Sequence, residues 1–403
     1  MEMTWSAATV PSNPPVKKGS AMGHGFKLAL GQWLLICLWT LKYLPYGGWR
    51  HLPKRALMYL LAVPALTLLQ VVHWVGFLCD ELFFRRYRQI EVRRPVFISG
   101  VPRSGTTHLH RVLSHHDELT SMRTWECLFA PSITERYIVR ALGWVLSPLA
   151  RVFGKVRLPF LKQMDAIHQL GLQEPEEDFL SLLPVNGCFL VVVLFPEEAS
   201  LWRLVRFDSA MPTRRKQTLM RFYRRMIQKH LYFHGAQRRY LCKNPSFASW
   251  LTSLRQQFPD ADFALCIRPA QKTLPSQLSS LLPGWQLFHG PRFTPAFEQR
   301  IVGMLAGYYR DIDLFCSENP DAQLVPMQQL TADLDGTVSQ LLDDLGLPMT
   351  PAYRQALDAE VEQAQQYRSG HQYQQQAFSV RWDQVAHRFD ARCAQAGVMQ
   401  EVA

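Results

Sequence analysis

Eight residues from Gly100 to Thr107 have the composition and spacing of a phosphate-binding loop. They follow a short β-rich run at residues 95–99 and precede a helical pattern. Their order, G-x-x-x-x-G-x-T, lets the amides of a loop and a helix start point at one anion. The lysine that usually follows the second glycine, and that serves the β- and γ-phosphates of a nucleoside triphosphate, is replaced by Thr106. The loop therefore predicts anion binding, with Arg103 as an internal cation, and argues against ATP or GTP hydrolysis.

The same stretch resembles the PRSGTT loop of the sulfotransferases that use 3′-phosphoadenosine 5′-phosphosulfate (PAPS). It reads Pro-Arg-Ser-Gly-Thr-Thr over residues 102–107. After a strand, this sequence is a much more specific signal than a lone glycine pattern. In that family the loop holds the 5′-phosphosulfate end of PAPS. The resemblance therefore implies cofactor contacts from Arg103, Ser104, Gly105, Thr106 and Thr107.

Two further strand ends extend the resemblance over roughly residues 93–345. Arg268 closes an apolar run and Ser276 follows eight residues later, a pattern like that of the family's 3′-phosphate site. A guanidinium grips a phosphate through two N–H groups, and a hydroxyl adds a neutral donor. Lys243 opens a Lys-Asn-Pro sequence that resembles the K-[DN]-P of tyrosyl-protein and PRSGTT-type bacterial sulfotransferases. That lysine lies beside the leaving phosphate, where it would neutralise developing negative charge.

Transfer of a sulfuryl group also needs a base for the proton of the acceptor. Glu126 follows the loop by about twenty residues, where a glutamate serves as base in the PRSGTT branch, and we expect it to be the base. His168 is the second candidate because imidazole titrates near neutral pH without tuning. The two could also divide proton transfer and acceptor orientation. Four acidic residues follow His168 closely: Glu174, Glu176, Glu177 and Asp178. Their simplest role is to stabilise the N-terminus of a helix through its dipole, and the alternative role is acceptor binding.

Two segments of the wider family are absent. The K-T-H-L-P sequence that carries the catalytic histidine of cytosolic sulfotransferases is missing, as is their glycine-rich loop near the C-terminus. Arg368-Ser-Gly-His371 is a candidate replacement for that loop. Because no cysteine, histidine or carboxylate cluster has convincing metal-ligand spacing, no metal is expected.

Short apolar runs alternate with helical patterns along the chain. The predicted strands cover residues 95–99, 191–195, 240–242, 263–267 and 324–326. Helical patterns include residues 214–234, 337–345 and 352–367. This alternation predicts an α/β fold with a P-loop-like parallel sheet flanked by helices, and an apolar helical extension at the N-terminus.

The positive charge of the chain is concentrated near its N-terminus. Residues 1–94 contain twelve basic and four acidic residues, which account for +8 of the net +11. Nucleic-acid binding would require a basic surface on the folded domain, whereas an apolar and basic terminus favours a membrane surface. We expect a disordered segment at 1–25, an apolar helical and membrane-associating segment at 26–92, and a sulfotransferase catalytic domain at 93–403.

Two uncharged apolar runs cover residues 28–41 and 56–79. Only the second is long enough to cross a bilayer. Basic clusters flank both runs, so two spans would conflict with the positive-inside rule. We therefore predict a shallow hairpin with four tryptophans near the headgroups: Trp33, Trp39, Trp49 and Trp74. The alternative is a helix pair buried against the catalytic domain.

These observations predict transfer of a sulfuryl group from PAPS to a hydroxyl or amine of an apolar or lipid-like acceptor. The expected place is the cytoplasmic face of a membrane, and eight cysteines without a CxxC pair favour a reducing cytosol. Aromatic stretches expected near the acceptor surround Trp125, Phe129, Trp285 and Phe288. The alternatives are a non-catalytic, membrane-associated nucleotide-binding protein on a degenerate sulfotransferase fold, or a P-loop kinase or NTPase.

Overall fold

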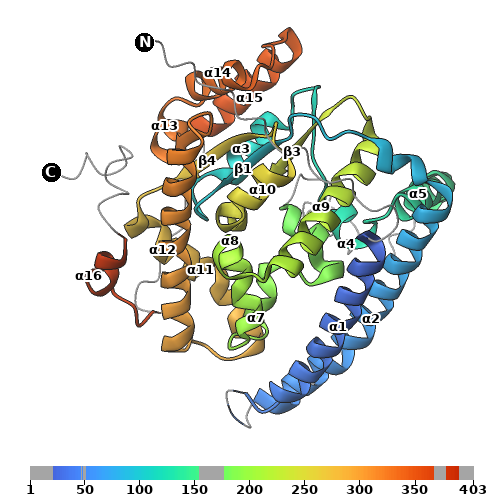
Figure 1. Cartoon of the computed structure of the whole chain (residues 1–403), viewed down its shortest axis with the longest axis vertical. Helices are drawn as coiled ribbons and strands as arrows, with labels where there is room; N and C mark the ends of the chain where they lie inside the picture. Colours follow the sequence, from blue (N-terminus) through green and yellow to red (C-terminus); the bar gives the residue numbers. More distant parts are fainter. Residues whose placement is uncertain (1–20, 47, 49–50, 154–176, 367–377, 390–403) are drawn as a thin grey trace, which may run out of the picture.

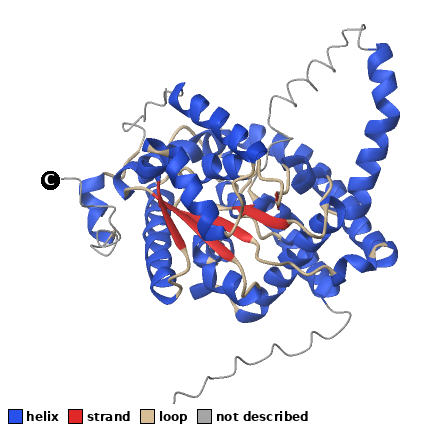
Figure 2. Cartoon of the chain, turned by 90° about the horizontal axis from the view of Figure 1, so that it is seen from above, coloured by secondary structure: helices blue, strands red, loops and turns tan. Residues whose placement is uncertain are grey.

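A parallel five-stranded sheet forms the centre of the molecule in the computed structural model, which describes residues 21–46, 48, 51–153, 177–366 and 378–389. The strands are β1 (Val96–Gly100), β2 (Leu119–Thr120), β3 (Arg239–Lys243), β4 (Asp262–Ile267) and β5 (Gln323–Pro326). Their order across the sheet is β2-β3-β1-β4-β5, and every pairing is parallel. The predicted α/β fold with helices around a parallel sheet is therefore confirmed (Figures 1 and 2).

Helices cover both faces of the sheet, as buried parallel strands require. In β1 the side chains alternate, so Val96 and Ile98 join one hydrophobic core and Phe97 joins the other. The first of these cores contains residues of α3 (Thr106–Leu113), α14 (Leu334–Leu345) and α15 (Pro351–Gln366). The second and larger core contains residues of α9 (Thr213–His234), α10 (Leu251–Gln257), α11 (Ala270–Phe288) and α12 (Pro295–Glu318).

One predicted strand is wrong. Residues 191–195 belong mainly to a 3₁₀ helix, Phe189–Val193, and the two-residue strand β2 was not predicted. A short apolar run is equally compatible with a buried strand and a buried helical turn. Here the backbone carbonyl of Val193 is held by His289, 2.6 Å from its Nε2, so the run packs against the end of α11 instead of pairing in the sheet.

The N-terminal extension is a helical hairpin. Helices α1 (Ala21–Lys42) and α2 (Leu52–Phe83) lie side by side along one flank of the body (Figure 1). Trp39, Tyr43, Tyr59 and Phe77 point into the larger hydrophobic core. The hairpin therefore shares a core with the sheet, and Trp39, which we expected near lipid headgroups, is buried.

Buried polar contacts fasten the hairpin to the rest of the chain. Asp80 accepts hydrogen bonds from the backbone N–H groups of Ile133 (2.9 Å) and Thr134 (2.8 Å), where α5 (Ile133–Phe153) begins. Its carboxylate also pairs with Lys229 at 2.6 Å, and both side chains are completely buried. Arg55, near the other end of α2, is buried and donates to the carbonyl of Phe288 at the end of α11. Both ends of α2 are therefore integral to the fold.

The opposite side of the hairpin is apolar and exposed. The leucines on this side recur every three or four residues in α1 and form an outward stripe, whereas in α2 further exposed side chains such as Leu60, Leu66 and Val72 widen it. In α1 the stripe is Leu30, Leu34, Leu38 and Leu41; in α2 it includes Leu57, Leu61, Leu68, Val71, Val75, Leu78 and Leu82; α5 adds Ile138, Leu142 and Trp144. We call these residues the lateral apolar face. Within the described parts of the chain, α2 is the one helix long and apolar enough to cross a membrane, and 11% of its most apolar stretch is buried.

Candidate active site

The loop between β1 and α3 has a conformation that depends on its glycines. Gly100 has a φ of 129°, and a Cβ atom there would lie 2.0 Å from the carbonyl oxygen of Cys266 on β4. Gly105, with a φ of 90°, immediately precedes α3. Arg103 also has a positive φ, 65°, which is uncommon for a residue with a side chain and is often found at functional sites. The turn places Thr106 and Thr107 at the start of α3.

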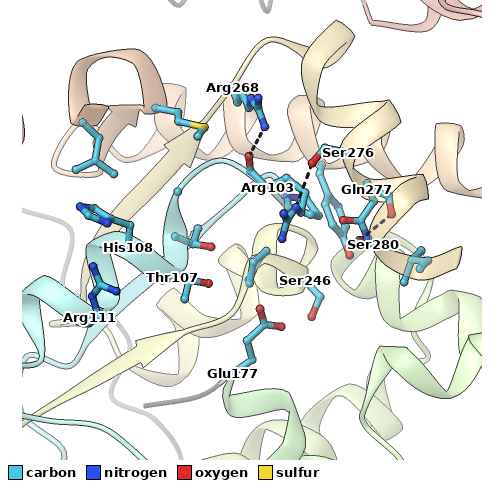
Figure 3. Close-up of a pocket in the computed structure, with 18 of the residues that line it drawn as sticks. Arg103, Thr107, His108, Arg111, Glu177, Ser246, Arg268, Ser276, Gln277 and Ser280 are labelled. Atoms are coloured by element: carbon cyan, nitrogen blue, oxygen red, sulfur yellow. Dashed lines mark hydrogen bonds between the residues drawn. The ribbon is translucent and has the colours of Figure 1, made fainter. Parts of the chain in front are cut away.

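Side chains from three segments meet around this loop (Figure 3). The guanidinium of Arg103 donates through Nε to Ser276 Oγ at 3.1 Å. Arg268, directly after β4, donates to the backbone carbonyl of Arg103 at 3.1 Å. The expected 5′ and 3′ phosphate residues are therefore neighbours. Ser104 differs, because its buried hydroxyl lies 2.6 Å from the carbonyl of Val101 and 3.1 Å from that of Cys266, so its side chain stabilises the loop.

Lys243 ends β3 beside the same loop. In the sheet it pairs with Ile98 of β1, which brings its side chain next to the start of α3. Its Nζ lies 3.3 Å from Thr107 Oγ1 and 3.2 Å from Glu177 Oε1, and the side chain is 2% exposed. The lysine is thus nearly buried, charge-paired and in contact with the phosphate-binding loop.

A cavity of about 860 Å³ adjoins this loop; Arg103, Arg268 and Ser276 line it, whereas Lys243 lies behind Thr107 and Glu177 and is not among its lining residues. Its polar wall contains Arg103, Thr106, Thr107, Arg268 and Ser276, together with Glu177. Its apolar wall is formed by residues that were not predicted: Phe179, Phe189, Leu190, Leu281, Met304, Met327 and Leu330. The aromatic residues expected near the acceptor, Trp125, Phe129, Trp285 and Phe288, are not among the residues that line this cavity.

Glu126 lies elsewhere and is itself fully buried, in a cluster of charged and imidazole groups in which the His234 side chain is 27% exposed. Its Oε1 is 2.7 Å from His234 Nε2 and 3.4 Å from Arg136 Nε, and its Oε2 is 3.7 Å from His230 Nδ1. Burial would raise the pKa of Glu126, but Arg136 and the two histidines hold it well below its usual range. Such a carboxylate is a weak base, and it does not line the cavity. This geometry speaks against the expected role of Glu126 as the base.

The same cluster also has the composition of a metal site. Ligand atoms of Glu126, His230 and His234 lie within 4.8 Å of one another. The guanidinium of Arg136 adjoins the shared carboxylate, and its positive charge opposes a divalent cation there. We therefore interpret these residues as a buried charge cluster that fixes α4 (Thr124–Phe129) against α9.

His168, the second expected base, lies outside the described residues, as do Glu174, Glu176, Arg368 and His371. Asp178 is described and is fully buried. It accepts hydrogen bonds from Tyr223 at 2.7 Å and from Tyr240, so it is a structural group behind the cavity wall. Of the acidic group in the sequence, Glu177 is the described member that faces the cavity. The feature of the sequence that could have identified Glu177 as a cavity residue is its position directly before Asp178 and Phe179.

Comparisons with known proteins agree with this geometry. The sequence model of the sulfotransferase family matches residues 95–151 and 197–351. Among solved structures, sulfotransferase STF9 from Mycobacterium avium is similar, with a TM-score of 0.69 at 14% identity over 97% of this chain and 99% of that chain. Sulfotransferase STF1 from Mycobacterium tuberculosis H37Rv gives 0.64 at 20% identity over 91% and 92%. A search of curated proteins finds no match. The structural likeness shows a shared fold, and because the family match extends over more than half of the sequence, the chain belongs to the sulfotransferase family and is a sulfotransferase.

Proposed function

We propose that this sulfotransferase moves a sulfuryl group from PAPS to a hydroxyl or amine of an apolar, lipid-like acceptor. The observation that carries the proposal is the convergence of cations, hydroxyls and one carboxylate on a single cavity. Arg103, Arg268 and Ser276 line it, and Lys243 adjoins it through Thr107 and Glu177. This is the donor set that a bisphosphate with an activated sulfuryl group requires.

The proposed residue roles give PAPS one orientation in the cavity. Its 5′-phosphosulfate would contact Arg103, Thr106 and Thr107 at the start of α3, and its 3′-phosphate would contact Arg268 and Ser276. The adenine would lie against Met327 and Leu330, which line the cavity. Both side chains are close to the loop: a Cβ atom placed on Gly105 would lie 3.7 Å from Met327 and 3.1 Å from Leu330. A flat apolar wall beside the phosphate sites suits a purine.

The transfer itself is an in-line displacement at sulfur. The acceptor oxygen or nitrogen forms a bond to sulfur while the bond from sulfur to the bridging phosphate oxygen breaks. The products are the sulfated acceptor and adenosine 3′,5′-bisphosphate. Lys243 would donate to the bridging oxygen as its negative charge grows, and a base must remove the acceptor proton.

We assign that base to Glu177 in place of Glu126. Glu177 lines the cavity, is half-buried and lies 3.2 Å from Lys243. Its pairing with Lys243 also links the two groups that must act in the same step. Glu126 has neither property, since it is sealed among Arg136, His230 and His234.

The acceptor is proposed to be apolar because of the wall opposite the phosphate sites. Phe179, Phe189, Leu190, Leu281 and Met304 line this side of the cavity, and they can bury a hydrocarbon or ring system. A long apolar molecule is poorly soluble, so a route to the cavity from a membrane would favour its capture.

We further propose that the lateral apolar face contacts the cytoplasmic side of a membrane. Exposed basic residues flank it, with Lys42 and Lys54 near the hairpin turn and Arg85 and Arg86 beyond the end of α2. Both ends of α2 also pack on the protein, which favours a helix lying along the bilayer over one that crosses it. The hairpin adjoins the acceptor wall, because Asn186 donates to Gln32 of α1 at 3.2 Å.

The test uses the purified full chain with radiolabelled PAPS and a lipid and metabolite extract. Glu177→Gln should lower kcat by ~10²–10⁴-fold, the usual effect of losing a general base, while affinity for adenosine 3′,5′-bisphosphate changes little. Glu126→Gln is the matched control. It should reduce stability, because Arg136 would lose its carboxylate partner, but the folded fraction should keep its turnover.

Two outcomes would contradict the proposal. Normal turnover of Glu177→Gln together with an inactive, folded Glu126→Gln would restore Glu126 as the base. Tight binding of adenosine 3′,5′-bisphosphate without transfer to any acceptor would favour the non-catalytic nucleotide-binding alternative.

A further inference from the structure

Three uncharged residues that can form hydrogen bonds also line the cavity. Gln277 and Ser280 come from α11, three residues apart and thus on one face of the helix. Tyr308 comes from the neighbouring α12. In Figure 3, Gln277 and Ser280 lie beyond Ser276, on the side away from His108 and Arg111. These three residues, which we call the neutral subsite, continue from the cationic groups, because Ser276, the residue before Gln277, accepts a hydrogen bond from Arg103.

The neutral subsite has unused hydrogen-bonding capacity. Tyr308 is fully buried, and its hydroxyl has no partner among the described residues. Gln277 is 7% exposed, and within the same parts of the chain no hydrogen bond occupies its side-chain amide. Its backbone carbonyl accepts from Ser280 Oγ at 2.8 Å. A buried hydroxyl without a partner lowers stability, so a bound molecule that completes its hydrogen bond would be favoured here.

The chemistry of these groups limits what they can recognise. A tyrosine hydroxyl, a serine hydroxyl and a carboxamide can each donate and accept, which matches the hydroxyl groups of a sugar or polyol. An anionic group is disfavoured here because Glu177 lines the same cavity, and the cations Arg103 and Arg268 are the groups assigned to phosphate. The apolar residues Leu281 and Met304 continue the wall directly beside the subsite.

We propose that Gln277, Ser280 and Tyr308 bind a neutral, hydroxylated head group, so that the acceptor is an uncharged amphiphile with a polyol or sugar head and an apolar tail. This inference rests on the proposed function, since it names the class of acceptor that the same cavity takes. The hydroxyl that receives the sulfuryl group lies at Glu177, and a second hydroxyl of the same head group bonds Tyr308.

The test measures binding of two probes to the full chain saturated with adenosine 3′,5′-bisphosphate. Octyl glucoside and 1-octanol share a tail and differ in the head group. By calorimetry, the glucoside should bind at least ~10-fold more tightly than the alcohol. Tyr308→Phe should weaken glucoside binding by about 5- to 20-fold and leave octanol binding within twofold, since only the hydroxyl is removed. Gln277→Leu should have the same pattern.

Tyr309→Phe is the matched control, because the Tyr309 hydroxyl bonds the carbonyl of Arg268 and Thr273 on the cofactor side. It should leave the preference for glucoside over octanol unchanged. Equal binding of the two probes to the wild-type chain, or a Tyr308→Phe variant that weakens both equally, would overturn the neutral subsite. These binding measurements need no turnover, so they test the neutral subsite independently of sulfuryl transfer. A failure of the proposed transfer would appear in the separate assay, as the absence of radiolabel in any acceptor.

Discussion

The two halves of the cavity are built by different kinds of structure. The cofactor half lies at the carboxyl ends of β1, β3 and β4, where the sheet register fixes Lys243 opposite Ile98 and Gly100 opposite Cys266. The acceptor half is built from 3₁₀ segments around Phe179 and Phe189 and from helices α11 and α12.

This difference separates what is common to the family from what is particular to this chain. The family match stops at residue 151 and resumes at 197, so it omits the segment that carries Glu177, Phe179, Phe189 and Leu190. Ligands of open parallel sheets bind where the strands end, and that place is set by the fold. The identity of the acceptor depends instead on segments that the sheet does not position.

The largest expected effect is on the cofactor half. Lys243→Ala should lower kcat by ~10²–10³-fold, the cost of losing one donor to the charge of the transition state. Affinity for adenosine 3′,5′-bisphosphate should fall much less. Lys272→Ala, an exposed lysine of α11, is the control and should retain full turnover. Steady-state kinetics with radiolabelled PAPS measure both, and normal turnover of Lys243→Ala would remove this lysine from the reaction.

The next largest expected effect is on nucleotide affinity, and it distinguishes the 3′-phosphate site from the 5′-phosphosulfate site. Arg268→Ala should weaken adenosine 3′,5′-bisphosphate by ~1.5–3 kcal/mol, as expected for a charge-assisted hydrogen bond. Adenosine 5′-phosphosulfate, which lacks the 3′-phosphate, should bind the variant and the wild-type chain equally. Calorimetry gives both affinities. If the wild-type chain binds adenosine 5′-phosphosulfate as tightly as PAPS, the 3′-phosphate assignment fails.

A smaller effect is expected on membrane binding, through which an apolar acceptor would reach the acceptor half of the cavity. The double substitution Leu61→Gln and Leu68→Gln on the lateral apolar face should reduce partitioning onto anionic vesicles by roughly tenfold, since two apolar contacts with lipid are lost. Leu314→Gln, an exposed leucine of α12, should leave partitioning unchanged. Co-sedimentation with vesicles measures this, and a wild-type chain that stays wholly soluble at low salt without detergent would contradict membrane contact. Substitution is preferable to removing residues 1–88, because Asp80 and Arg55 hold the fold together.

The last expected effect is on stability and comes from Asp178, which is buried behind the cavity wall. Burial raises the pKa of Asp178 to about 6, so the folded chain binds this proton more tightly than the unfolded chain does. Its contribution to stability is therefore complete below its unfolded pKa of 3.8 and is lost as the pH rises through about 6. Asp178→Asn, which cannot titrate, should lack that decline. Thermal unfolding from pH 4 to 7 tests this, and parallel curves for the two proteins would contradict it.

Sequence reasoning succeeded where local pattern determines structure. The loop at residues 100–107 and the strands ending at Lys243 and Ile267 follow from apolar runs and glycine spacing, and they lie together as parallel strand ends must. It failed where distant segments decide. The environment of Glu126 depends on His230 and His234 of α9, more than a hundred residues away, and no local signal placed α9 beside that carboxylate. The run 191–195 likewise became helical because of its contact with His289.

The buried pair of Asp80 and Lys229 has a consequence for how the chain is made. The two residues are 149 positions apart, so at about 5–20 residues per second the ribosome delivers Lys229 roughly 7–30 s after Asp80. During that interval the last turn of α2 lacks the cation that neutralises its carboxylate in the folded chain. The hairpin, although it is synthesised before the catalytic body, is therefore fastened to α9 only once that body has been made.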